Sequence, residues 1–287
     1  DIRRGVIRCI GEPERRFHED ALRILRGMRF LASLGFRVEE GTAAAMLDSR
    51  GLLRNISAER VFTELSGLLT GRKSGGNIRR VLTQFRDILA EVVPEFRAGF
   101  DFEQHSRFHS LDIYQHLLAS AEAAARIAPG ELPLALAMLL HDIGKPERFT
   151  LDGSGEGHFY GHAQVSADIA DSVLRRLRTS TALREQVCEI VRYHDIPLPE
   201  NDRQFRRMLS KHGEELSRDI AMAHIADDMA KKPECLPRCE DWRRLISRIP
   251  EMAQESCLSV KSLAVDGGAL SGIVPPSPLM GEVLKFL

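Results

Sequence analysis

The sequence contains little that would support disulfide bonding. Its cysteines are odd in number and scattered, at Cys9, Cys188, Cys235, Cys239 and Cys257. Only Cys235 and Cys239 lie close together, and no second close pair completes a zinc site. We therefore expect reduced thiols, as in most proteins of the cytosol.

The sequence also lacks a secretion signal and any apolar run long enough to span a bilayer, which predicts a cytoplasmic protein without membrane contact. The formal net charge of -1 means that any contact with nucleic acid would depend on a local basic patch. A hydrophobic content of 43% and a charged content of 28% are typical of a globular protein with a core. A length of 287 residues fits one large domain or two to three small ones.

No strong alternation of apolar and polar residues is present, and residues 2–10 are the one short strand candidate. Apolar spacings of three and four dominate instead, so we predict an all-α fold with short connections. Residues 154–158 are interpreted as a turn. The predicted helices cover residues 17–34, 56–69, 78–93, 111–127, 132–143, 163–177, 183–193, 205–211, 216–230 and 242–253.

The most informative residues are histidines and aspartates in the middle of the chain. His116 lies on a predicted helix, His141 and Asp142 end a very apolar one, and Asp227 lies near the end of a third. Imidazole nitrogen and carboxylate oxygen together suit a divalent ion such as Mg, Mn, Fe, Ni or Co. The alternative is that these histidines are ordinary packed or surface side chains. However, burying ionisable groups at the edge of an apolar helix without a partner would cost free energy.

An adjacent histidine and aspartate can point at one ion only where the helix ends or bends. Gly144 permits a bend directly afterwards, and Pro146 prevents the helix from continuing. Three further histidines at predicted loop or helix-end positions, His109, His162 and His194, could bind a second ion or a substrate phosphate. Lys145 could hold a phosphate oxygen as a point charge.

His116, the pair His141-Asp142 and Asp227 resemble the H…HD…D signature of the HD superfamily of metal-dependent phosphohydrolases. The run from residue 138 to 145, MLLHDIGK, is a close match. The resemblance implies that these four residues bind a metal, which polarises a phosphate and activates water. It also places His162 and His194 where some members hold a second metal or the substrate.

The amino-terminal third is locally rich in arginine. On the predicted helix, Asp20 and Arg23 are three residues apart and share a face, as do Arg23, Arg26 and Arg29. A carboxylate beside a guanidinium offers both hydrogen-bond senses and can read the edge of a base. The alternative is an exposed ion pair worth a few tenths of a kcal/mol.

Residues 16–30 and 34–36 resemble the neck of class II tRNA nucleotidyltransferases (CCA-adding enzymes) and bacterial poly(A) polymerases. Their EDxxR motif falls on Glu19, Asp20 and Arg23, which implies that the aspartate and arginine template incoming CTP or ATP, with Arg26 and Arg29 as further nucleotide-binding candidates. Residues 1–8 resemble the segment that links the catalytic head of that family to the neck, and residues 56–60 with Glu64 resemble the next neck motif. Residues 257–267 and 278–284 resemble the body and tail that bind tRNA.

The resemblance implies three parts: neck and body over residues 1–97, an HD domain over 98–232, and body and tail over 233–287. The chain begins at Asp1 without Met and stops at Leu287 inside an apolar run, so we expect a piece of a longer protein. The polymerase head of that family would lie upstream of Asp1. This chain alone is therefore expected to add no nucleotides, since two-metal polymerisation needs the head's carboxylates.

Three functional hypotheses remain open. The first is part of a CCA-adding enzyme whose HD domain hydrolyses phosphoesters such as 2′,3′-cyclic phosphates, nucleotides or RNA-end phosphates. The second is a non-catalytic tRNA-binding module with a structural HD block, and the third is a free-standing HD phosphohydrolase. The sequence leaves open the metal, the choice between CCA addition and poly(A) synthesis, and whether the tail or HD block forms a homodimer.

Overall fold

The computed structural model describes residues 1–255 and confirms the all-α prediction. The helices are α1 (Pro13–Glu19), α2 (Leu22–Leu34), α3 (Glu40–Asp48), α4 (Ala58–Thr70), α5 (Ile78–Gln84), α6 (Arg86–Val92), α7 (Ile113–Ile127), α8 (Leu132–Leu140), α9 (His162–Arg176), α10 (Thr181–Tyr193), α11 (Asp202–Met229) and α12 (Pro237–Glu255). Strand β1 (Val6–Ile7) pairs in parallel with β2 (Arg37–Val38), and β3 (Thr150–Leu151) pairs antiparallel with β4 (Gly157–His158).

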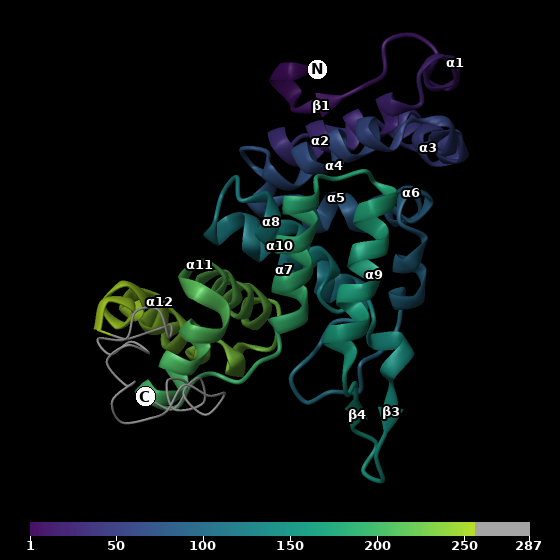
Figure 1. Cartoon of the computed structure of the whole chain (residues 1–287). Helices are drawn as coiled ribbons and strands as arrows, with labels where there is room; N and C mark the ends of the chain where they lie inside the picture. The colour runs from purple at the N-terminus through teal and green to yellow at the C-terminus, as the bar shows by residue number, and fades with distance from the viewer. Residues whose placement is uncertain (256–287) are drawn as a thin grey trace, which may run out of the picture.

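The amino-terminal helices lie across the upper ends of α7, α9 and α10, and the β3–β4 hairpin projects from the opposite end (Figure 1). One buried apolar cluster extends from Phe17 in α1 to Ala226 in α11. A second, smaller cluster joins α11 to α12 around Phe205 and Trp242. The core therefore continues from the amino-terminal helices into the helices that carry the histidines. Within residues 1–255, the structure contains no helix long and apolar enough to cross a membrane.

The single helix predicted over residues 17–34 is wrong, because two helices, α1 and α2, cover this segment. The chain leaves the helical conformation at Asp20 (φ -155°, ψ 101°), which separates α1 from α2. The Asp20 carboxylate then accepts a hydrogen bond from the backbone N–H of Leu22, a pattern typical of aspartate at a helix start. Asp20 and Arg23 therefore do not share a face of one helix, as the spacing predicted.

Several other boundaries differ from the prediction. Residues 78–93 form two helices because Phe85 departs from helical angles (φ -116°, ψ 34°). The two helices predicted at 205–211 and 216–230 both lie within α11, where the non-helical Gly213 (φ 74°, ψ 174°) separates two helical segments. The turn at 154–158 belongs to the β3–β4 hairpin, and β1 falls inside the strand candidate 2–10. The tail matches at 257–267 and 278–284, and Cys257, lie outside the described residues; the four described cysteines are free thiols.

Candidate metal centre

Six of the predicted site residues converge on one buried cluster. His116 lies on α7, and Asp227 on α11. His141 and Asp142 directly follow α8, while His162 begins α9 and His194 follows α10. All six side chains are buried, so five helices of the fold each contribute to one polar cluster at the edge of the core. We call these six residues the His/Asp cluster.

One half of the His/Asp cluster contains the four residues of the H…HD…D pattern. His116 Nε2 lies 3.0 Å from Asp227 Oδ1 and 3.4 Å from Asp142 Oδ2. His141 Nε2 lies 3.3 Å from Asp142 Oδ2 and 3.6 Å from Asp227 Oδ1. The two imidazoles face each other with their Nε2 atoms 3.3 Å apart. Two imidazole nitrogens and two carboxylate oxygens are thus aimed at one point.

The other half uses the second oxygen of the same aspartate. His162 Nε2 lies 3.1 Å from Asp142 Oδ1, and His194 Nε2 lies 3.4 Å from it. These two Nε2 atoms are 3.3 Å apart. Asp142 therefore stands between two pairs of histidines, with one carboxylate oxygen facing each pair.

Backbone carbonyls orient three of these imidazole rings in the same way. The Nδ1 atom lies 2.8 Å from Met138 O in His141, 2.8 Å from Phe159 O in His162 and 2.7 Å from Val191 O in His194. A carbonyl oxygen only accepts, so Nδ1 carries the proton in each ring and Nε2 is directed into the cluster. Hydrogen bonds of this kind fix the tautomer of metal-binding histidines.

The donor set fits a divalent cation. Two pairs of histidine Nε2 atoms meet at 3.3 Å in this cluster, and a ring that is neutral and protonated at Nδ1 would present an Nε2 lone pair to an ion. Oδ1 of Asp142 and Oδ1 of Asp227 are buried without a hydrogen-bond donor. Although burial opposes charge on His141, the carboxylates of Asp142 and Asp227 raise its pKa to about 9. The cluster therefore favours positive charge at the point where the nitrogen and oxygen atoms meet.

Two ammonium groups, one buried and one half-buried, accompany the two carboxylates. Lys145 Nζ lies 2.6 Å from Asp142 Oδ2 and donates to Gln104 Oε1 at 2.9 Å. Lys231 Nζ lies 2.5 Å from Asp227 Oδ2. Burial alone would raise the pKa of each aspartate, but the neighbouring histidines and lysines hold both well below the usual range. Lys145 was predicted from the sequence, whereas Lys231 and Gln104 were not. Gln104 lies 41 positions from Lys145, but the i,i+4 spacing of Lys231 from Asp227 was a signal that could have identified Lys231.

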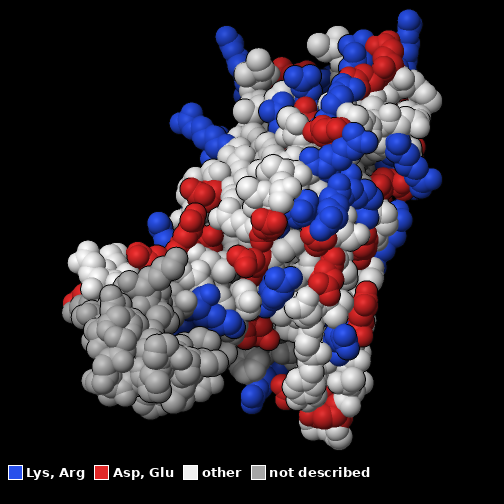
Figure 2. Space-filling model, in the orientation of Figure 1, with Lys and Arg blue, Asp and Glu red and all other residues white. Residues whose placement is uncertain are grey.

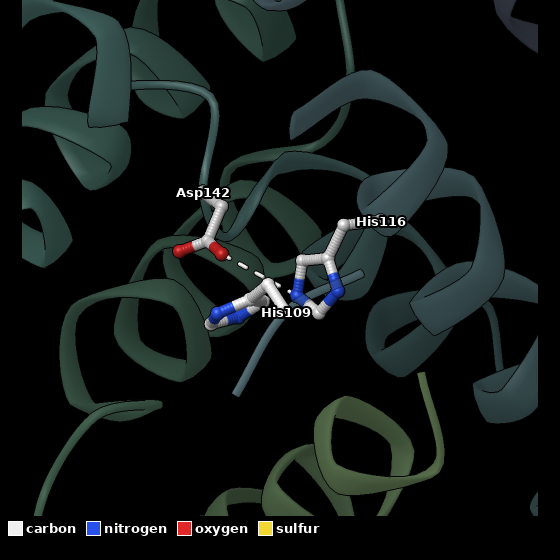
Figure 3. A group of neighbouring side chains, drawn as sticks. All are labelled: His109, His116 and Asp142. Atoms are coloured by element: carbon white, nitrogen blue, oxygen red, sulfur yellow. Dashed lines mark ion pairs between the residues drawn. The ribbon is translucent and has the colours of Figure 1, made fainter. Parts of the chain in front are cut away.

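His109 joins the cluster from the loop before α7. Its ring centroid is 4.8 Å from that of His116, and its Nε2 atom is buried without a partner. Figure 3 shows the His109 ring beside the ion pair that joins His116 to Asp142. Burial, with a further contribution from the charge of Lys145, lowers the pKa of His109 to about 2, so the ring is neutral. His109, His116 and Asp142 therefore form a group whose two nitrogens and one carboxylate oxygen could hold a metal ion.

Gly144 is needed for a different reason from the one predicted. Its backbone conformation is open to any residue (φ -88°), so no bend requires glycine. A Cβ atom there would lie 2.7 Å from Ser166 N and 3.0 Å from Val165 C on α9. The absence of a side chain lets the His141–Asp142 turn approach α9, the helix that supplies His162.

The predicted nucleotide-binding residues lie apart from the His/Asp cluster. Glu19 Oε2 pairs with Arg23 Nη1 at 2.9 Å, and Asp20 Oδ2 pairs with Arg60 Nη2 on α4 at 3.0 Å. Glu19, Asp20 and Arg60 line a cleft of about 350 Å³. The sequence placed Arg60 in the neck motif at residues 56–60 but did not indicate its contact with Asp20, which spans forty positions.

The two remaining arginines of the neck differ in their contacts. Arg26 is exposed, and no ion pair is found for it among residues 1–255. Arg29 Nε donates to the buried Glu64 Oε2 at 2.6 Å. Lys and Arg side chains gather over the region where α4, α6 and the upper end of α9 meet (Figure 2). Part of this charge is neutralised, for example where Arg178 pairs with Glu59 at 2.8 Å.

Comparisons with known proteins agree with both parts of this description. Residues 113–236 match the model of the HD domain family, and residues 35–97 match that of the probable RNA and SrmB-binding site of polymerase A. An A-adding tRNA nucleotidyltransferase of Deinococcus radiodurans is 31% identical over 303 residues, which cover 100% of this chain and 67% of that protein. The chain belongs to the tRNA nucleotidyltransferase family.

Other members of the tRNA nucleotidyltransferase family are similar over shorter spans or in fold alone. A CC-adding tRNA nucleotidyltransferase of Thermus thermophilus is 32% identical over 240 residues, which is 81% of this chain and 54% of that protein. The CCA-adding enzyme of Bacillus stearothermophilus in complex with CTP shares the fold, with a TM-score of 0.56 and 24% identity, over 99% of this chain and 60% of that one. The chain thus spans between about half and two thirds of these relatives.

Proposed function

We propose that the His/Asp cluster is a divalent-metal site that hydrolyses phosphoesters within a tRNA nucleotidyltransferase chain. The observation that carries this proposal is the position of Asp142, whose two oxygens each face a pair of inward-directed histidine nitrogens. A bridging carboxylate between two such sets suits two ions held close together. The first would be held by His116, His141, Asp142 and Asp227, and the second by His162, His194 and Asp142.

A divalent ion bound there would polarise a phosphate and lower the pKa of a water molecule. The protein side chains would position the substrate around it. Lys145 and Lys231 place ammonium groups at the two carboxylates, where they would also attract phosphate oxygens. His109, which is neutral at pH 7, would accept or donate a hydrogen bond rather than contribute charge.

Replacement of Asp142 tests this proposal directly. Asp142→Ala is expected to lose bound metal and turnover of bis-p-nitrophenyl phosphate together, because both sets of ligands share this carboxylate. Asp152→Ala is the matched control, since Asp152 also pairs with a histidine, His158 at 2.9 Å, but on the exposed hairpin. Metal content by atomic absorption and turnover of the diester are measured on both variants. Retention of full metal content by Asp142→Ala would show that the proposed ligand set is wrong.

Metal stoichiometry separates the two halves of the cluster. We expect about two equivalents of Mn²⁺ per chain, falling to about one in the double variant His162→Ala/His194→Ala. Loss of the two histidines leaves the four residues of the other half in place. A stoichiometry of one in the unsubstituted protein would confine the site to that half and leave His162 and His194 to the substrate.

Residues of the predicted neck support a second role, the binding of nucleotide and tRNA by the complete enzyme. The cleft with Asp20 and Arg60 presents a carboxylate and a guanidinium side by side, which is the pairing needed to read a base edge. We propose that Glu19, Asp20, Arg23, Arg26 and Arg29 belong to the nucleotide and tRNA site of the complete enzyme. A protein that binds tRNA but holds no metal would favour the non-catalytic alternative. The division of the chain into three parts at residues 97 and 232 stays a proposal, and so does the formation of a homodimer.

A further inference from the structure

Resting on the proposed phosphoesterase function, we infer that Phe108 is a stacking surface for a nucleobase. Phe108 directly precedes His109, whose ring contacts His116 of the His/Asp cluster, and its own ring lies near the guanidinium groups of Arg107 and Arg238. The substrate would be a nucleotide or an RNA end, with its phosphate on the cluster and its base on Phe108. The geometry thereby assigns substrate recognition to three residues outside the metal site.

The position of Phe108 beside the cluster follows from its neighbours. The next residue, His109, contacts the His116 ring at a centroid distance of 4.8 Å. Phe108 O accepts a hydrogen bond from Lys232 N at 3.0 Å, directly after Lys231, which pairs with Asp227. The loop is therefore attached to the cluster on one side and to the end of α11 on the other.

The surroundings of Phe108 suit an aromatic, anionic ligand. The ring is 42% exposed, although most large apolar side chains of the described residues are buried. Arg107 Cζ lies 4.7 Å and Arg238 Cζ 5.9 Å from its centroid. A base can stack on such a ring, and flanking guanidinium groups add cation–π and phosphate contacts.

The two arginines are held in place by acidic neighbours. Arg238 Nη2 lies 2.5 Å from Asp228 Oδ1, and Arg107 Nε lies 3.7 Å from Glu156 Oε1 at the β3–β4 hairpin. Lys232 Nζ also donates to Arg107 O at 2.8 Å. Because hairpin, loop and α11 are linked in this way, the stacking surface is largely formed before a ligand binds, which reduces the entropy cost of binding.

Binding measurements on the full 287-residue chain loaded with Mn²⁺ test this inference. Affinities for adenosine 5′-monophosphate and for inorganic phosphate are measured by titration calorimetry, and their ratio reports the contribution of the base. Phe108→Ala is expected to lower that ratio about five- to hundredfold, the range of base–aromatic stacking. Phe108→Trp is expected to restore it, because the larger ring also stacks.

Phe30→Ala is the matched control. Phe30 is 36% exposed and lies under Arg29 at 4.6 Å, but on α2, which contributes nothing to the cluster. An unchanged ratio in Phe108→Ala, an equal fall in Phe30→Ala, or a parent chain that binds both ligands equally would overturn the inference. If the ratio behaves as expected but no phosphoester is hydrolysed, the stacking surface stands and the proposed hydrolase function is wrong.

Discussion

The ammonium group of Lys231 lies 2.5 Å from Oδ2 of Asp227, four residues earlier in the chain. The Lys231 side chain is 15% exposed and that of Asp227 8% exposed, so this pair is largely withdrawn from water. Asp227 Oδ1 faces His116 on the other side. One carboxylate thus joins a lysine to the His/Asp cluster, and the charge of Lys231 compensates that of Asp227 when no metal is bound.

Lys231→Met is therefore expected to destabilise the metal-free protein more than the metal-loaded one. Removing one partner of a buried ion pair costs about 3 kcal/mol, because the other charge is left unpaired. A bound cation would compensate the Asp227 carboxylate and reduce that loss. Urea unfolding of the variant with EDTA and with Mn²⁺ measures the difference. Lys232→Met is the control, and equal losses in the two buffers would contradict the expectation.

Gly144→Ala is expected to destabilise the protein by about 1–3 kcal/mol, the usual cost of forcing extra volume into a packed site. The added methyl group would lie 2.7 Å from the backbone nitrogen of Ser166, so the His141–Asp142 turn or α9 must move. Because that turn carries two cluster residues, Mn²⁺ affinity should fall as well. Gly76→Ala is the control, since nothing lies within 4 Å of a Cβ atom there. A thermal melt and a Mn²⁺ titration of both variants measure these effects.

The sequence predicted the helices that carry the His/Asp cluster to within a few residues. Apolar spacing is strong in these segments, and Asp112 caps α7 by accepting from Gln115 N, as an aspartate before a helix does. The meeting of His116, His141–Asp142 and Asp227 was predicted from residue type and the family pattern. Their common position at helix ends or on buried faces follows from the need to give ionisable groups partners.

Contacts between residues distant in sequence were not predictable from spacing. Arg60 meets Asp20 only because the chain breaks at Asp20, which the apolar pattern of residues 17–34 conceals. Phe108 is joined to Lys232 by a backbone contact, and no side-chain pattern encodes such a contact. Close approach of two backbones likewise explains Gly144, where sequence alone suggested a bend.

Two ion pairs of the neck should differ in their contribution to stability. Arg29→Met leaves Glu64, whose side chain is 9% exposed, buried without its partner, and is expected to cost about 3 kcal/mol. Arg60→Met leaves Asp20, which is 34% exposed, and is expected to cost less than about 1 kcal/mol because water replaces the lost partner. Urea unfolding of both variants at pH 7 measures the two values. A larger loss in Arg60→Met would contradict the assigned difference in burial.

His224 makes the fold sensitive to acid. Its ring stacks on Trp242 with centroids 4.0 Å apart and an interplanar angle of 12°, and Nε2 is buried without a partner. Burial lowers the pKa of His224 to about 3, below the 6.5 of an unperturbed histidine. Between these values the unfolded chain binds a proton that the folded protein does not, so this residue reduces stability as pH falls below about 6.5.

His224→Phe keeps the stacking on Trp242 and removes the titrating group. The free energy of unfolding of the variant, relative to the parent chain, should therefore increase by about 2 kcal/mol between pH 7 and pH 5, within the limit of about 1.4 kcal/mol per pH unit for one group. Urea unfolding in EDTA at both pH values measures this difference, and the other histidines cancel because both proteins contain them. Parallel pH dependence of the two proteins would mean that His224 is protonated in the folded state, and that its ring is hydrated rather than enclosed.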